Sequence, residues 1–452
     1  MEFDESYVRR ATPLLAFTTL IVLYAEAMLI PSIPRIQAEF GVTPAEASWI
    51  LAVYFLSGTI FAMVFGRLGD VYGRKKLLIT ALSFFTLAVL FNAFVPSFHA
   101  FIAFRALQGV GMATAPLAYA LVREQFPREK APFAQGLISA MNGLGLIIAL
   151  PLGGFIAEHY GWRVTFWSVF PFSLILIFLI AVTIRESRAG KAEKEFDWPG
   201  AALFALSASS LLILISNGPQ WGIKSEKTVL TALTFILSSV ALIMHERRSE
   251  VPLIPLSISD RNISSSLIAA FLAAVAFQVI FLTLTYLFQS PKPYGYGVES
   301  SRAGSLMIPM VVAYMLSAPL GGKLVVRVGA KVMGIAGGAV ASIAYLILAL
   351  SSHMGLGVVL ALIAAGASGM ALLNVAVINT LTFSAPREVL GASTGLFTTF
   401  RSVGSSLGPS IGGAVLSALS LPMAFKVNFL LVASSFALAT SLFLSVREVV
   451  KG

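Results

Sequence analysis

The sequence lacks cysteine and contains few charged residues. Without cysteine, the chain can form neither disulfide bonds nor thiolate metal sites. Charged residues make up 12% of the 452 residues and hydrophobic residues 57%, and the mean hydropathy is +0.88. Soluble domains carry about 25% charged residues. This composition excludes a chain made of ordinary soluble domains and indicates a protein solvated by lipid.

Histidine is also scarce, and catalytic groupings of side chains are missing from the sequence. The four histidines lie near the ends of apolar runs, too scattered for a metal site: His99, His159, His245 and His353. No Ser/His pair or pair of aspartates suggests catalysis. Glycine-rich stretches inside apolar runs are not followed by Lys-Ser or Lys-Thr, unlike a phosphate loop. We expect no enzyme activity, no catalytic residue, no metal and no cofactor.

Long apolar runs take up nearly the whole chain. A helix needs about 20 mainly apolar residues to cross the hydrocarbon core of a bilayer. The first run contains Glu26 and is followed by no small-residue cleavage pattern, so it is expected to be a retained span. The sequence predicts an all-α membrane protein with fourteen transmembrane helices near residues 11–33, 46–66, 77–95, 100–122, 131–157, 163–184, 198–217, 226–245, 263–288, 303–325, 332–351, 355–383, 390–418 and 424–446.

The net charge of +10 arises from basic residues in short loops. Of the 31 lysines and arginines, 22 lie in loops on the side of the N-terminus, 7 lie on the opposite side, and Arg105 and Arg401 lie inside spans. Cytoplasmic loops carry such an excess of positive charge. Both termini are therefore expected in the cytoplasm. The chain is expected to be a multi-pass protein of the cell (inner, cytoplasmic) membrane, with the lipid bilayer and not nucleic acid as its partner.

Two stretches of the first half recur in the second half. Residues 66–75 and 322–331 share Gly, Leu, Gly and Lys at equal spacing, 256 residues apart. The glycine pairs of 151–154 and 408–413 are 259 residues apart. Chance similarity among Gly-rich apolar helices is the alternative, but parallel repeats are typical of transporters. The predicted parts are a six-helix bundle in 1–188, two additional helices in 189–250 and a second six-helix bundle in 251–452.

The loop after the second span carries the most specific motif. The stretch Gly66-Arg-Leu-Gly-Asp-Val-Tyr-Gly-Arg-Lys-Lys76 resembles the signature loop of the major facilitator superfamily. In the fourth span, Arg105-Ala-Leu-Gln-Gly-Val-Gly111 looks like the motif of the drug:proton antiporters of that superfamily. The fifth span resembles the antiporter glycine motif only in part, because Leu150-Pro151 replaces the usual Gly-Pro pair. The resemblance covers nearly the full chain.

The span count also resembles one branch of this superfamily. Fourteen spans, with the seventh beginning at Asp197-Trp-Pro-Gly200 and ending at Gly218-Pro-Gln-Trp-Gly222, are similar to the fourteen-helix drug:proton antiporters. That branch usually has an acidic residue earlier in the first span, where Val22 stands here. The resemblance implies a monomeric, proton-coupled secondary transporter that exports amphipathic or cationic small molecules by alternating access. A carrier of an organic acid, sugar or other metabolite is the alternative.

Ionisable residues at membrane depth are costly and are candidates for function. Glu26 and Arg105 lie at a similar depth, about 22 Å from the cytoplasmic face at 1.5 Å per helical residue. The resemblance implies that their helices line a central cavity. We therefore predict that this pair binds substrate and couples transport to protons. The alternative is a static ion pair that holds two helices together.

Other polar residues inside spans are candidates for substrate binding. Arg401, near the midplane of the thirteenth span, is suited to an anionic group, although it would serve equally well as an anchor for helix carbonyls. Six uncharged residues are further candidates, with interhelical hydrogen bonding as the alternative role: Tyr24, Gln108, Asn142, Gln278, Asn374 and Asn379.

The signature loop is predicted to act in gating. The resemblance implies that Asp70 lies against the cytoplasmic start of the thirteenth span, where a helix dipole favours a carboxylate. Arg123 is the expected ion partner, and mere topological charge is the alternative. The predicted gating residues are Gly66, Asp70, Gly73, Arg74, Lys75 and Arg123. Close helix packing is predicted at Gly145, Pro151, Gly153, Gly154, Gly408, Pro409, Gly412 and Gly413.

Overall fold

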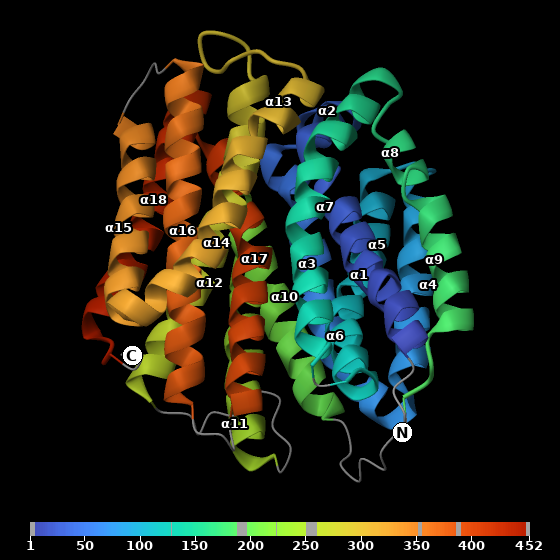
Figure 1. The fold of residues 1–452 in the computed structure, drawn as a ribbon. Coiled ribbons are helices and arrows are strands. Elements are labelled where there is room, and N and C mark those ends of the chain that lie inside the picture. The colour runs from blue at the N-terminus through green and yellow to red at the C-terminus, as the bar shows by residue number, and fades with distance from the viewer. Residues whose placement is uncertain are drawn as a thin grey trace. The chain divides into compact units, whose positions relative to one another are not determined.

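A computed structural model describes residues 5–127, 129–187, 197–222, 224–249, 260–350, 355–385 and 390–448. Within these ranges the regular secondary structure is helical (Figure 1). Of the histidines considered as metal ligands, His353 lies outside the described residues.

The predicted spans each correspond to one helix or to two or three consecutive helical segments. Thirteen segments within the described ranges are long and apolar enough to cross a membrane. The remaining predicted span, the thirteenth along the chain, is α17 (Leu390–Ala418), which is 29 residues long but contains 15 Ser, Thr and Gly residues. The prediction of an all-α membrane protein is therefore confirmed. The orientation of the termini stays a prediction.

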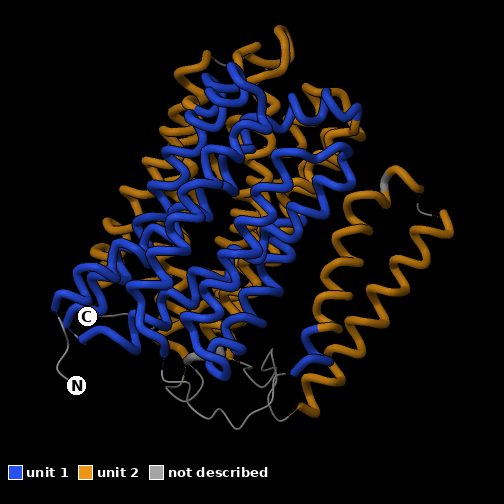
Figure 2. The backbone as a smooth tube through the Cα atoms, turned by 90° about the vertical axis from the view of Figure 1, so that its right-hand side faces the viewer, with its two compact units in different colours: residues 1–41, 53–201, 300–304 blue, residues 42–52, 202–299, 305–452 orange. Residues whose placement is uncertain are grey.

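The chain divides into two compact units, which Figure 2 distinguishes by colour. Unit 1 comprises residues 1–41, 53–201 and 300–304. Its elements are α1 (Glu5–Ala27), η1 (Ile30–Ser32), α2 (Ile33–Phe40), most of α3 (Pro44–Tyr72), α4 (Arg74–Asn92), α5 (Phe98–Gln108), η2 (Gly109–Ala113), α6 (Thr114–Gln125), α7 (Ala131–His159), α8 (Val164–Trp167) and α9 (Phe170–Thr183), together with the start of α10 (Trp198–Trp221) and of α13 (Ser300–Leu306).

Unit 2 comprises residues 42–52, 202–299 and 305–452. Besides α17 and most of α10 it contains α11 (Glu226–Arg248), α12 (Arg261–Gln289), α14 (Ile308–Val328), α15 (Ala330–Leu350), α16 (Leu356–Ser384) and α18 (Leu421–Ser445). A hydrogen bond of 2.7 Å joins the hydroxyls of Ser207 and Ser239, so α10 and α11 form a hairpin. The predicted division at 188 and 250 stays a prediction, because both boundaries fall outside the described residues.

Glycines allow close approach of backbones within each unit. In unit 1, a Cβ at Gly153 would collide with the carbonyl of Met28. In unit 2, a Cβ at Gly408 would lie 2.6 Å from the carbonyl oxygen of Val275. Helices without a water-driven hydrophobic force between them depend on such small-residue packing. Larger side chains at Gly153 and Gly408 would therefore push α7 away from the turn after α1 and α17 away from α12, whereas a Cβ at Gly412 would make only ordinary contacts of 3.6 Å.

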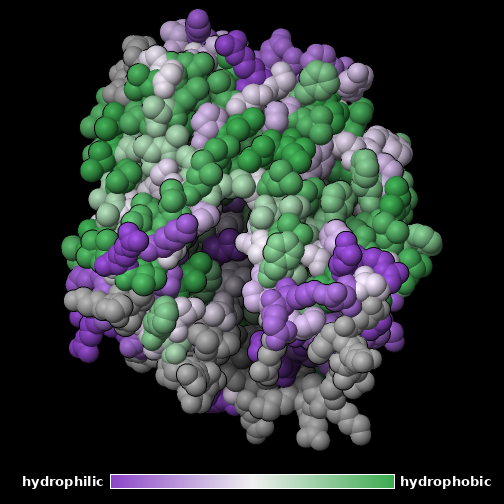
Figure 3. Space-filling view, viewed as in Figure 1, coloured by the Kyte–Doolittle hydropathy of each residue, from purple (hydrophilic) through white to green (hydrophobic). Residues whose placement is uncertain are grey.

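Apolar side chains cover the outside of the helices. On α11, large side chains such as Leu230, Leu233 and Leu237 are about half exposed or more. Figure 3 shows mainly green, hydrophobic side chains along the middle of the helices and purple, hydrophilic ones toward their ends. Lipid favours this distribution, because unsolvated polar groups are costly in hydrocarbon.

Candidate functional site

A fully buried polar cluster lies between α4 and α5 of unit 1. The side chains of Asn92, Arg105 and Gln108 are each 0% exposed. Nη1 of Arg105 donates a hydrogen bond of 2.9 Å to Oε1 of Gln108, and Nδ2 of Asn92 donates one of 3.1 Å to the same oxygen. Two donors on one amide oxygen fix the rotamer of Gln108 and hold the guanidinium in place.

An aromatic ring from α3 covers the guanidinium. The Arg105 Cζ atom lies 4.5 Å from the centre of the Tyr54 ring, within the range of a cation–π interaction. The Tyr54 hydroxyl donates to the carbonyl oxygen of Val22 on α1 at 3.4 Å. Tyr54 therefore connects the buried arginine with the helix that carries Glu26.

Glu26 belongs to the same group of charges. Its side chain is 8% exposed near the end of α1, and it interacts electrostatically with both Arg105 and Tyr54. The structure thus brings together the two residues that the sequence pairs by depth. Their role in proton coupling stays a prediction. Tyr54 and Asn92 were not predicted, although Tyr24 and Asn142, which are the same residue types in apolar runs, were.

The backbone next to this cluster departs from a regular α-helix. The fourth span changes to the 3₁₀ segment η2 directly after Gln108. A Cβ at Gly109 would collide with Ser57, and one at Gly58 would collide with Met112. A mid-helix 3₁₀ stretch often marks a hinge. The glycines allow α3 to approach η2 and press Tyr54 against the arginine.

Three other predicted binding residues lie apart from this cluster. Tyr24 shares a 2.9 Å hydrogen bond with the Ser168 hydroxyl. Asn142 is exposed on α7. Gln278 is 6% exposed, and its Cβ packs against Gly408 on α17. The contacts of Tyr24 and Gln278 fit interhelical packing, and contact of any of the three with a substrate stays a prediction.

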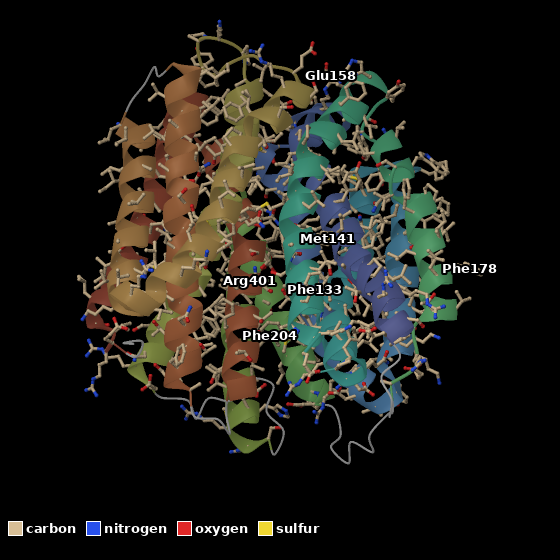
Figure 4. All side chains as sticks on the ribbon, in the orientation of Figure 1. Phe133, Met141, Glu158, Phe178, Phe204 and Arg401 are labelled. Atoms are coloured by element: carbon tan, nitrogen blue, oxygen red, sulfur yellow. The ribbon has the colours of Figure 1, made fainter. Side chains whose placement is uncertain are left out.

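A second polar group lies in unit 2. The amide of Asn374 on α16 donates a 3.0 Å hydrogen bond to the Tyr314 hydroxyl on α14. Arg401, labelled on α17 in Figure 4, is exposed and interacts electrostatically with Tyr314. Asn379 instead donates to the Val375 carbonyl oxygen of its own helix at 2.8 Å. Of these residues, Tyr314 was not predicted.

The predicted gating residues of the first signature loop form an ion network. Arg74 pairs with Asp70 at 2.9 Å and with Glu124 at 3.0 Å, and it also donates to the Ala120 carbonyl oxygen at 3.2 Å. These contacts join the end of α3, the start of α4 and the end of α6. Arg123 was the expected partner of Asp70, but it is exposed and Asp70 pairs with Arg74 instead. The reason is that Asp70, near the end of α3, and Arg74, at the start of α4, are only four residues apart across the turn at Gly73.

A distant carboxylate clamps the start of α4. Both oxygens of Glu186 accept hydrogen bonds from backbone amides, at 2.9 Å from Lys75 and 3.2 Å from Lys76. Gly73 precedes this helix with φ of 102°, and a Cβ there would lie 2.7 Å from the Glu186 carboxylate. Free amides at a helix start favour an anion. We call Gly73 and Glu186 the first clamp.

Unit 2 repeats this arrangement at the start of α15. Glu448 accepts backbone hydrogen bonds of 3.0 Å each from Ala330 and Lys331, and Gly329 precedes them with φ of 87°. We call Gly329 and Glu448 the second clamp. The carboxylates were missed in the sequence, although each follows an arginine, in Arg185-Glu186 and Arg447-Glu448.

Within the described residues, no group of three or more His, Cys, Asp or Glu side chains could hold a metal ion.

The pattern of the Major Facilitator Superfamily matches residues 15–409 and also 266–451. The chain belongs to this superfamily. Membership confirms the resemblance seen in the signature loop, and it makes the protein a multi-pass membrane transporter of small molecules and not an enzyme.

Relatives of this major facilitator protein are named for resistance and export. The multidrug resistance protein Stp of Mycobacterium tuberculosis is 30% identical over 88% of this chain and 74% of its own. The tetracenomycin C resistance and export protein of Streptomyces glaucescens is 25% identical over 85% of this chain and 71% of its own.

Solved transporter structures share the fold. A bacterial homologue of the human lysosomal transporter Spinster, crystallised inward-facing and unoccupied, has a TM-score of 0.70. The match covers 98% of this chain and 99% of that one at 16% identity. At this identity the likeness supports the helical fold and gives no information about the substrate.

Proposed function

We propose that this protein is a proton-coupled antiporter of the cell membrane that exports small molecules as a monomer by alternating access. The observation that carries the proposal is the buried group around Arg105, which places a guanidinium, the Tyr54 ring and the Glu26 carboxylate within electrostatic reach of one another. The relatives named for multidrug resistance and export support export as the direction.

The coupling step follows from the charge of Glu26. An ionised Glu26 is stabilised by Arg105 and destabilised by its 8% exposed, largely apolar surroundings. A cationic substrate that approaches Glu26 competes with a proton for the carboxylate. Proton and substrate then occupy the site in turn, and that exclusion is the basis of exchange.

Arg105 is suited to a fixed role in this exchange. Gln108 and Tyr54 hold the guanidinium from two sides, so its positive charge stays in place when Glu26 changes protonation state. A fixed positive charge releases the proton of Glu26 readily once the carboxyl becomes accessible. In this proposal, Glu26 is the group that carries the proton and Arg105 positions and tunes it.

Gating is assigned to the first signature loop. The Asp70–Arg74–Glu124 network joins three helix ends of unit 1 through partly exposed ion pairs. Exposed pairs contribute only about 0–1 kcal/mol each. Such contacts can break and re-form during transport at little cost, which suits a gate better than a rigid support.

Accumulation of a fluorescent lipophilic cation in liposomes tests the proposal. Under an imposed pH gradient, the wild type should accumulate the cation and Glu26→Gln should not. Without a gradient, exchange of labelled for unlabelled cation should also be weakened in Glu26→Gln, because the neutral side chain resembles the protonated state that excludes the cation. Glu129→Gln, an exposed carboxyl in a turn, is the matched control. Full gradient-driven accumulation by Glu26→Gln would exclude this residue as the coupling site.

A carrier of organic anions is the second candidate. It is favoured by one observation, the exposed Arg401 beside Tyr314 in unit 2. The same liposomes loaded with an aromatic carboxylate in place of the cation distinguish the two candidates. Transport of the carboxylate without any cation transport would favour the anion carrier.

A further inference from the structure

Arg401 is a cation at membrane depth with no acidic residue on the neighbouring helices. The sequences of α12, α14, α16 and α17 contain no Asp or Glu, and neither do those of α15 and α18. An arginine at this depth is costly unless its charge is compensated. These six helices therefore offer Arg401 only neutral side chains as partners, and water or a ligand can supply the rest of the compensation.

Arg401 lies at the same level as two polar residues from other helices. It is 11 residues after the start of α17, and Asn374 is 10 residues before the end of α16. At 1.5 Å per residue these positions are roughly 16 Å and 15 Å from the same side. Tyr314, 14 residues before the end of α14, is at roughly 21 Å.

The hydrogen bond between Asn374 and Tyr314 leaves a donor available. The phenol oxygen accepts from the Asn374 amide at 3.0 Å, so its own proton is directed to another acceptor. A hydroxyl that accepts one hydrogen bond donates the next one more strongly. The Tyr314 hydroxyl and the Arg401 guanidinium together offer convergent donors, which is the requirement for binding a carboxylate.

Aromatic surface adjoins these donors. The rings of Phe277 and Tyr314 are 6.1 Å apart at 42°, and those of Phe277 and Phe281 are 4.8 Å apart at 80°. Tyr314, Phe277 and Asn374 are all partly exposed, and Arg401 is exposed. A ligand can therefore reach the donors and place a flat ring against Phe277.

We propose that Tyr314, Asn374 and Arg401 form a subsite for the carboxylate of an amphipathic aromatic substrate, with Phe277 against its ring. This inference rests on the proposed transport of small molecules and names a substrate class for it. Arg105 is unsuited to the same task, because it is 0% exposed and its guanidinium already bonds to Gln108. The two intramembrane arginines thus serve different purposes: Arg105 acts within the protein and Arg401 on the substrate.

Binding of two matched probes tests the subsite. The full-length protein in lipid nanodiscs is titrated with 2-naphthoate and with 2-naphthylmethylammonium, which share a ring and differ in charge. Arg401→Gln should weaken naphthoate binding roughly tenfold or more, because a charge-assisted hydrogen bond is lost. The ammonium probe should change less than twofold.

Three further variants separate charge from geometry. Tyr314→Phe should weaken naphthoate binding about threefold or more, as expected for one neutral hydrogen bond. Arg401→Lys should retain part of the affinity, because it keeps the charge and loses the planar fork. Lys426→Gln removes an exposed cation from α18 of the same unit and should leave both probes unchanged.

Several outcomes would overturn the subsite: a wild type that binds no naphthoate, an Arg401→Gln variant with unchanged naphthoate affinity, or equal loss of both probes. Failure of the proposed antiport is distinguished from failure of the subsite by comparing naphthoate binding with proton movement in liposomes. If naphthoate binds in an Arg401-dependent way but no substrate moves protons in liposomes, the subsite stands and proton coupling is wrong. If cations exchange for protons and naphthoate does not bind, the antiport stands and the subsite is wrong.

Discussion

The signature loop at residues 66–76 (the first loop) and its repeat at residues 322–331 (the second loop) share a helix-start clamp but differ in their charged residues. In both, a glycine with positive φ starts a helix whose first amides bond to a distant carboxylate, Glu186 in the first clamp and Glu448 in the second. The first loop also has Asp70 and Arg74 in an ion network. At the equivalent positions, 256 residues later, the second loop has Val326 and Ala330.

This difference suggests that the shared clamps support the fold and that the Arg74 network, present only in the first loop, acts in gating. A feature kept in both halves is expected to serve a need that both halves share. Here that need is to hold the start of one helix against a carboxylate from a distant part of the same half. A feature present in one half is expected to serve a step that needs only that half. The clamps should therefore determine stability, and the Arg74 network should determine the rate of transport.

The largest expected effect is on the clamp glycines. Gly73→Ala and Gly329→Ala each force a side chain into positive φ and toward a carboxylate. Strain of this kind costs about 1–3 kcal/mol before the collision is counted. Both variants should lower the melting temperature of the purified protein clearly and by similar amounts, measured by a thermal unfolding assay.

Matched controls exist in both loops. A Cβ at Gly66 or Gly322 would have no atom within 4 Å. Gly66→Ala and Gly322→Ala should therefore leave the melting temperature within error or raise it slightly. A large loss in one clamp and none in the other would contradict the common role of the clamps.

The next largest effect is expected from substitution of the clamp carboxylates. Glu186→Ala and Glu448→Ala each remove two hydrogen bonds from helix-start amides. The loss should be about 1–3 kcal/mol in each half, again seen in thermal unfolding. Glu129→Ala, which removes an exposed carboxyl, is the control. Clearly unequal losses would mean that only one of the two clamps stabilises the folded protein.

The ion network should affect transport more than stability. Arg74→Ala breaks contacts to Asp70, Glu124 and a carbonyl, and should slow transport several-fold while the melting temperature changes little, since exposed pairs contribute about 0–1 kcal/mol. Lys331→Ala in the second loop is the comparison and should leave transport nearly unchanged. The measurement is initial transport rate in liposomes at equal protein content. A slow Lys331→Ala would remove the distinction between the loops.

The smallest effect should be at Arg123. It is exposed, and Asp70 pairs with Arg74. Arg123→Ala should therefore change neither the melting temperature nor the transport rate measurably in the same two assays. A loss as large as that of Arg74→Ala would restore Arg123 as a member of the gate.

The span count and the repeat were accessible from sequence, because both depend on local composition and spacing. Apolar runs of helix length predicted each span, and equal spacing of Gly73 and Gly329 marked the repeat. The clamp carboxylates escaped this reasoning because they lie more than a hundred residues away along the chain, and which helix end meets which loop is a matter of packing.

The partners of buried charges were harder still. Depth along a helix placed Glu26 and Arg105 at one level, but depth says nothing about which face a side chain occupies. Tyr54 and Tyr314 resemble ordinary apolar packing in sequence, and only helix rotation turns them toward an arginine. Arg123 was chosen over Arg74 for its position at a helix end, although Arg74 is only four residues from Asp70 across the turn at Gly73.

Proton movement measured with a pH-sensitive dye inside liposomes tests the central claim most directly. With no gradient imposed, addition of a transported cation outside should alkalise the lumen in the wild type, because the cation enters as protons leave. Glu26→Gln should abolish this response. An unchanged response in Glu26→Gln, or substrate transport by the wild type with no proton movement, would contradict the account.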